Sequence, residues 1–82
     1  MMKVKVIKQD SEHFRAQLEK YAHLLEPVDY SQIKRRERYI RYLPADKYWA
    51  VFTMPHAVNA TPILRSRFDN VISAVHSALG YP

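Results

Sequence analysis

The chain has 82 residues, of which 48% are hydrophobic and 26% charged, and its formal net charge is +5. This length allows a single domain, and the composition is that of a folded globular protein rather than a disordered segment. The lack of cysteine excludes disulfides and thiolate metal sites, and no apolar run reaches the roughly 18 residues that a membrane-spanning helix needs.

The first elements in the chain are a predicted strand and a predicted helix. Residues 3–8 alternate polar and apolar side chains, which is the pattern of a half-buried strand. This start lacks the long apolar run of a signal peptide, so we expect a cytoplasmic protein. Asp10 or Ser11 can cap a helix. Five apolar residues then follow at helical spacing: Phe14, Leu18, Tyr21, Ala22 and Leu25. Pro27 lies beyond the expected helix end, and residues 27–34 are predicted to form a connection.

Two strands joined by a tight turn come next. Residues 36–43 and 48–54 are rich in aromatic and β-branched side chains, and the four residues between them suit a hairpin. With Leu43 opposite Tyr48, the expected pairs are Ile40–Val51 and Tyr42–Trp49 on one face, and Tyr39–Phe52 and Arg41–Ala50 on the other. Both faces are partly apolar, so both need a cover. Two helices on one face would supply only one of these covers.

The clearest helical pattern lies near the end of the chain. Thr61 is a good N-cap, Pro62 suits the first helical position, and Gly80 suits the C-terminal cap. Between them, six apolar residues recur at helical spacing: Leu64, Phe68, Val71, Ile72, Val75 and Leu79. The resulting order is β-α-β-β-α. We predict one α+β domain over residues 1–82, with a three-stranded sheet and two helices packed on one face.

Basic residues concentrate in the segment that contains the hairpin. Residues 34–47 hold six basic and two acidic side chains, a net charge of +4, interleaved with aromatic rings. Because cations hold phosphates and rings stack on bases, this pattern predicts a nucleic-acid-binding surface. Its residues are Lys34, Arg35, Arg36, Arg38, Arg41, Tyr42 and Trp49. Strand alternation places Arg36 and Arg38 on the side of Tyr42 and Trp49, and Arg41 on the opposite side. The alternative is structural, since cations on exposed strands also discourage edge pairing.

A second candidate is an anion site at the start of the predicted last helix. Free backbone amides would meet Thr61, Arg65 and Arg67 there. The structural alternative is that Arg65 pairs with Asp69 on the helix surface. None of the four histidines has a partner at metal-ligand spacing, and the single glycine excludes a glycine-rich phosphate loop. We therefore predict no metal, no cofactor and no enzymatic activity.

Two functions remain open at this point. The first is a small, basic, non-enzymatic nucleic-acid-binding accessory domain without membrane contact. The second is a protein-binding adaptor or inhibitor module that uses its open sheet face. A patch of Ile40, Tyr42, Trp49 and Val51 would be too large for a free monomer, which predicts a homodimer. The salt dependence of the binding affinity distinguishes the two functions, because phosphate binding weakens steeply with salt and binding through an apolar interface does not.

Overall fold

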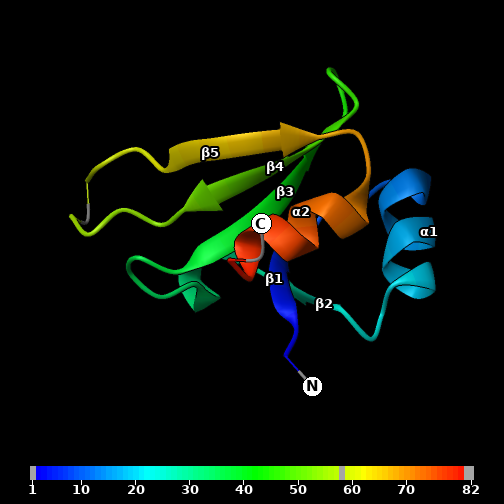
Figure 1. The fold of residues 1–82 in the computed structure, drawn as a ribbon, viewed down its shortest axis with the longest axis horizontal. Coiled ribbons are helices and arrows are strands. Elements are labelled where there is room, and N and C mark those ends of the chain that lie inside the picture. The colour runs from blue at the N-terminus through cyan, green and yellow to red at the C-terminus, as the bar shows by residue number, and fades with distance from the viewer. Residues whose placement is uncertain (1, 58, 81–82) are drawn as a thin grey trace.

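The computed structural model describes residues 2–57 and 59–80, and it has a five-stranded mixed sheet with two α-helices (Figure 1). The elements are β1 (Val4–Ile7), α1 (Glu12–Lys20), β2 (Leu25–Val28), the 3-10 helix η1 (Tyr30–Gln32), β3 (Arg38–Leu43), β4 (Tyr48–Thr53), β5 (Ile63–Phe68) and α2 (Val71–Ala78). The strand order is β2-β1-β3-β4-β5, with β1 parallel to β2 and β3, and the other pairs antiparallel. In this described part of the chain, neither helix is long and apolar enough to cross a bilayer.

The predicted three-stranded sheet is therefore wrong, although the α+β class and the two helices agree with the structure. The first missed strand is β2, whose first residue, Leu25, was assigned to the helical stripe. In the structure α1 ends at Lys20, and the Tyr21 carbonyl accepts hydrogen bonds from the Leu24 and Leu25 amides. This turn leads the chain back beside β1. Pro27 fits β2 because the strand lies at a sheet edge, where a missing N–H costs little.

The second missed strand, β5, replaces the first half of the predicted last helix. The N-cap of α2 is Asn70, whose side-chain oxygen accepts a hydrogen bond from the Ser73 amide at 2.9 Å. The predicted cap, Thr61, lies in the loop before β5. The helical spacing misled because Phe68 of β5 and Val71 of α2 fall on one helical stripe by coincidence. Without β5, β4 would be a sheet edge with apolar side chains on both faces.

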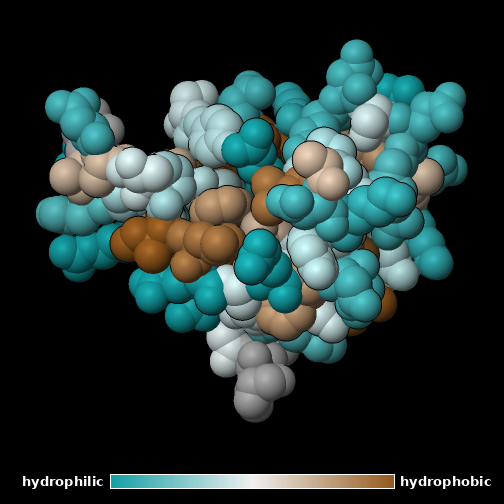
Figure 2. Space-filling view, turned by 90° about the horizontal axis from the view of Figure 1, so that it is seen from above, coloured by the Kyte–Doolittle hydropathy of each residue, from teal (hydrophilic) through white to brown (hydrophobic). Residues whose placement is uncertain are grey.

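The two edges of the sheet differ in length and in chemistry. The β2 edge is short and contains Pro27. The β5 edge is six residues long and exposes Ile63 and Leu64, each 48% accessible. Figure 2, which views the molecule from the β5 side, shows an apolar area within a largely polar surface. An exposed apolar edge of this kind can pair with another strand.

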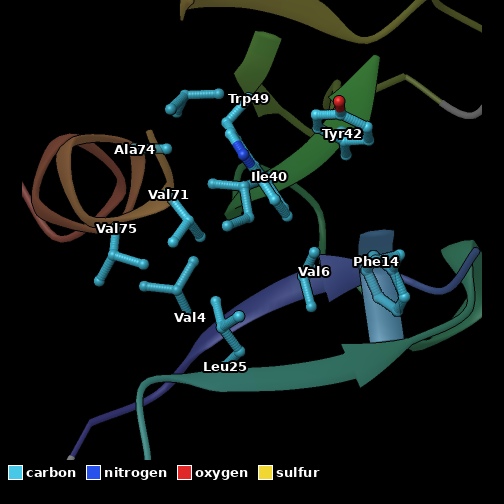
Figure 3. Close-up of a cluster of buried hydrophobic side chains, with 11 residues drawn as sticks. Val4, Val6, Phe14, Leu25, Ile40, Tyr42, Trp49, Val71, Ala74 and Val75 are labelled. Carbon is cyan, nitrogen blue, oxygen red and sulfur yellow. The ribbon is translucent and has the colours of Figure 1, made fainter. Parts of the chain in front are cut away.

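Both helices cover the same face of the sheet, and the main core lies beneath them (Figure 3). Its buried members are Val4, Val6, Phe14, Leu25, Ile40, Tyr42, Trp49, Val51, Val71, Ala74 and Val75. The predicted β3–β4 register is confirmed, with Ile40 opposite Val51 and Tyr42 opposite Trp49. The apolar patch on which the homodimer prediction relied is thus covered by α1 and α2. The reason for predicting a homodimer no longer holds.

The opposite face of the sheet has a smaller core under a different cover. Ile7, Val28, Ile33 and Tyr39 are buried there, beneath the connection between β2 and β3 that contains η1. Parallel crossover connections are right-handed. The steps from β1 to β2 and from β2 to β3 run in opposite directions across the sheet, so their connections lie on opposite faces. The η1 connection is the second cover that the sequence left unassigned. Beyond this connection, Arg41, Tyr48 and Arg67 are exposed on the β3–β4–β5 part of the same face, which we call the open face, whereas Ala50 between them is buried.

Candidate functional site

The structure distributes the seven residues of the predicted nucleic-acid site over different surfaces. Tyr42 and Trp49 face the helices and are only 8% and 2% exposed. The imidazole of His13 packs against Tyr42, with ring centroids 4.6 Å apart. Neither ring can stack on a base in this arrangement, so this part of the prediction is wrong. The predicted strand alternation correctly placed Tyr42 and Trp49 on one face, but the two helices cover that face.

The basic residues before β3 form a separate group at one end of the sheet. Lys34 and Arg35 are exposed in the turn that precedes β3. Arg36 has a left-handed backbone, with φ of 67°, so strand alternation does not apply to it. Arg38 starts β3 on the helix-covered face, and its guanidinium donates to the Ser77 carbonyl of α2 at 3.2 Å. Arg38 is therefore directed to the helix-covered side, and Arg36 does not follow the strand pattern that was to place it beside Tyr42.

Arg41 is the member of the predicted nucleic-acid set that lies on the open face. Arg41 of β3 and Arg67 of β5 both pair with Ala50 of β4, so the three residues form one row across the strands. Two interstrand spacings, roughly 10 Å, separate the outer strands. The Arg67 guanidinium carbon lies 5.7 Å from the centre of the Tyr48 ring, which is a cation–π contact. Two arginines thus flank Ala50, whose methyl group is fully buried beneath the surrounding side chains.

Aromatic side chains border this row on both sides. Tyr48 lies toward the β3–β4 hairpin and is 40% exposed. On the other side Phe52 stacks on Tyr39, with ring centroids 5.6 Å apart and an interplanar angle of 18°. Burial and the neighbouring Tyr30 raise the pKa of Tyr39 to about 12, whereas the charge of Arg41 lowers it. The open-face site is hereafter Arg41, Tyr48, Ala50, Phe52 and Arg67.

The electrostatic character of the open-face site is uniformly positive. Strands β3, β4 and β5 contain four arginines and no acidic residue. Within residues 2–57 and 59–80, the ion pairs lie elsewhere, at Lys5–Glu37 and at Arg15–Asp10. The guanidinium groups of the open-face site have no carboxylate partner in this part of the chain. They can therefore bind an external anion without breaking an internal salt bridge.

The predicted anion site at Thr61, Arg65 and Arg67 does not form, because no helix begins there. Arg65 lies at a β-bulge in the β4–β5 pair and donates from Nε to Thr53 Oγ1 at 2.9 Å, whereas Arg67 belongs to the open face. Sequence reasoning missed the roles of Arg67 and Tyr48. The Asp69-Asn70 pair, which suits a turn and an N-cap, was the signal that could have ended a strand at Phe68.

Two pockets lie at opposite ends of the sheet. One, of about 300 Å³, is near the β3–β4 hairpin and has mixed charge, with polar groups from His13, Gln17, Lys47, Asp69 and Asn70 above the edges of Tyr42 and Trp49. The other, of about 360 Å³, is near the starts of β1 and β3 and is basic, with Lys3, Lys5, Arg36, Glu37 and Arg38 in its lining. Across the described residues, histidine, aspartate and glutamate form no group of three or more that could hold a metal ion.

Comparisons with known proteins do not assign a family to this chain. No protein-family model matches the sequence, and no curated protein or solved structure is significantly similar to it. The function is therefore inferred from the chemistry of the open-face site and of the two pockets, without support from relatives. Of these features, the open-face site brings two exposed arginines, Arg41 and Arg67, together with the exposed ring of Tyr48.

Proposed function

We propose that the protein binds single-stranded nucleic acid on its open face. The observation that carries this proposal is the row of Arg41, Ala50 and Arg67 with an aromatic ring on either side. Guanidinium groups hold phosphates through paired hydrogen bonds, and the rings of Tyr48 and Phe52 offer π faces to unpaired bases. Ala50 itself is fully buried beneath its neighbours, so a bound strand would contact the exposed side chains of Arg41, Tyr48 and Arg67 around it.

The charge distribution favours the same class of ligand. The chain carries a net charge of +5, and all charged side chains of the three strands that form the open face are arginines. Attraction to phosphates supplies most of the affinity of sequence-independent binding, and this attraction falls steeply with salt. A single strand suits the flat site better than a duplex, because stacking on protein rings requires base faces that are free.

The decisive experiment compares two double variants that remove the same charge from different surfaces. Arg41→Ala with Arg67→Ala removes both cations of the open-face site. Arg15→Ala with Lys20→Ala removes two cations from α1, on the helix-covered side. Each phosphate contact with a single strand contributes about 0.7 to the slope of log affinity against log salt. The first variant should therefore lower the slope by roughly 1.4, and the second should change it much less.

Fluorescence anisotropy with a labelled oligonucleotide of about ten nucleotides, at several salt concentrations, measures affinity and slope together. Equal effects of the two double variants would indicate diffuse attraction and would contradict the open-face site. Failure of the unaltered protein to bind DNA or RNA at low salt would refute the proposal as a whole.

A protein partner is the second candidate function, and the β5 edge favours it. Ile63 and Leu64 are exposed there, and β5 has no strand on its outer side. An adaptor or inhibitor could bind a strand of its partner along this edge. Two copies of this chain could also pair through their β5 edges. Light scattering that shows salt-insensitive self-association, lost in Leu64→Ser, would favour this function. A strict monomer that binds oligonucleotides would favour the open-face proposal instead.

A further inference from the structure

We infer that the basic pocket at the starts of β1 and β3 binds a terminal phosphoryl group, such as a phosphate monoester or pyrophosphate. The pocket is lined by side chains from two basic segments that are far apart in the sequence. Because β1 and β3 are neighbours in the sheet, Lys3 and Lys5 lie beside Arg36 and Arg38. This site is separate from the open-face site, and its ligand need not be a nucleic acid.

Two of the four cations already have partners inside the protein. Lys5 Nζ donates to Glu37 Oε1 at 3.0 Å and to the Gln32 carbonyl at 2.7 Å. Arg38 donates to the Ser77 carbonyl in the last turn of α2. This contact places a positive group at the negative end of the helix, which would otherwise oppose an anion in the pocket.

The carboxylate in the pocket is also accounted for. Burial alone would raise the pKa of Glu37, but hydrogen bonds from the Lys34 amide and the Lys5 ammonium outweigh it and hold that pKa below its usual value. Glu37 is therefore ionised near neutral pH, and Lys5 balances its charge at close range. Within residues 2–57 and 59–80, no second carboxylate pairs with the remaining cations of the pocket.

Lys3, Arg36 and Arg38 carry this remaining charge, and Arg36 is held in place at a conformational cost. Its φ of 67° lies in the left-handed region, which strains every residue that has a Cβ. Its amide donates to the Met54 carbonyl at 2.8 Å, so its backbone is anchored to the end of β4. Glycine would adopt this conformation without strain. Arg36 also belongs to the lining of the pocket, which makes its guanidinium a candidate ligand for an anion there.

The chemistry of the pocket suits a terminal phosphoryl group better than a phosphodiester. A phosphate monoester carries about two negative charges near neutral pH and presents three acceptor oxygens, whereas a diester carries one charge. The planar guanidinium of Arg36 can hold two of these oxygens, and the Lys3 ammonium adds a point charge. A volume of about 360 Å³ also leaves room for the atoms next to the phosphoryl group. The group could belong to a small molecule or to the end of a nucleic-acid strand.

The test titrates the protein with inorganic phosphate and then pyrophosphate, against sodium chloride at the same ionic strength, and follows backbone amide NMR signals. We expect saturable shifts at Lys3, Arg36 and Gly80, which line the pocket. Arg36→Gln should weaken pyrophosphate binding roughly tenfold or more, because it removes a charge-assisted contact. Arg35→Gln is the matched control, since Arg35 is adjacent and exposed but lies outside the pocket lining.

Arg36→Gly separates binding from folding. Glycine adopts the left-handed conformation without strain, so this variant should fold at least as well as the unaltered protein and still lose affinity. Equal weakening in Arg35→Gln and Arg36→Gln would overturn the inference, as would shifts that sodium chloride reproduces. Either result would mean that the pocket responds only to ionic strength and does not bind the phosphoryl group specifically.

A second comparison identifies the source of the phosphoryl group. Oligonucleotides with a phosphate at the 5′ end, at the 3′ end or at neither end are measured against the same variants. An end preference that Arg36→Gln abolishes supports the inference with a nucleic-acid ligand, and pyrophosphate binding without an end preference supports it with a small molecule. The pyrophosphate-induced shifts at Lys3, Arg36 and Gly80 should persist in Arg41→Ala with Arg67→Ala, so failure of the open-face proposal is distinguishable from failure of this inference.

Discussion

Tyr48 and Trp49 are adjacent on β4 and point to opposite faces of the sheet, so substitutions at these positions should have opposite consequences. Tyr48 is half-exposed on the open face, whereas Trp49 is buried beneath α1 and α2. The informative pair is Tyr48→Ala and Trp49→Phe. The first removes an exposed ring, and the second shortens a buried ring while keeping an aromatic side chain in the core.

The expected magnitudes follow from what each side chain touches. Trp49→Phe removes roughly three buried ring atoms, which at about 0.8 kcal/mol per carbon costs roughly 2 kcal/mol of stability. A domain of this length has a free energy of unfolding of about 4–12 kcal/mol, so the variant still folds. Tyr48→Ala should lose less than about 1 kcal/mol of stability, mainly its cation–π contact with Arg67. It should weaken oligonucleotide binding by about 1–3 kcal/mol, the contribution of one stacked base.

Urea unfolding followed by circular dichroism measures the stability of each variant, and fluorescence anisotropy at low salt measures its affinity for the oligonucleotide. Trp49 is the sole tryptophan, so its fluorescence in the unaltered protein also reports burial directly through resistance to acrylamide quenching. The reasoning is refuted if Trp49→Phe weakens binding as much as Tyr48→Ala and leaves stability unchanged. That result would mean that the helices do not cover this face.

Three further substitutions test the packing and the backbone. Ile40→Ala, at a position with no exposed surface, should lower the free energy of unfolding by roughly 3–4 kcal/mol, and Ile72→Ala, at a position 39% exposed, by about 1 kcal/mol. Similar losses in urea melts would contradict the boundary between β5 and α2. The pKa of Tyr39 is about 12 in the folded chain and about 10 when unfolded, so its ionisation favours the unfolded state. The free energy of unfolding should thus fall as pH rises from 10 to 12, and it should fall less in the Tyr39→Phe variant. If the free energy of unfolding of the two proteins falls in parallel over this range, Tyr39 is not the cause. Lys47→Gly should raise stability by about 0.5–1 kcal/mol in a thermal melt, because Lys47 has φ of 58° in the hairpin; a lower Tm would show that its side chain is needed.

The hairpin and its register could be predicted from the sequence because both depend on local information. Alternating side chains and a four-residue connection determine which residues of β3 and β4 lie opposite each other. The cap of α1 is also local, and Ser11 accepts a hydrogen bond from the Phe14 amide as expected for an N-cap. These features do not depend on how the distant parts of the chain pack.

The open face could not be predicted because it depends on where the helices pack. Alternation shows that Tyr42 and Arg41 point to opposite faces, but it does not show which face α1 and α2 cover. The failure to predict β5 has a similar cause, because its apolar residues fit the spacing of a helix as well as that of a strand. Only the need of β4 for a partner strand resolves that ambiguity. The open-face positions of Tyr48 and Arg67, which the sequence did not predict, follow from these two long-range facts.

The strand order also has a consequence for how the chain folds. Strands β3, β4 and β5 pair with their neighbours along the chain, whereas β1 pairs with β3 only after α1, β2 and η1 have been placed. Loop-closure entropy opposes distant pairings until other contacts compensate for it. We therefore expect the antiparallel half to form first and the β1–α1–β2 unit to dock last. The basic pocket takes Lys3 and Lys5 from the late unit and Arg36 and Arg38 from the segment next to the early one. A ligand in this pocket would bind only after docking and would stabilise the docked state against reopening.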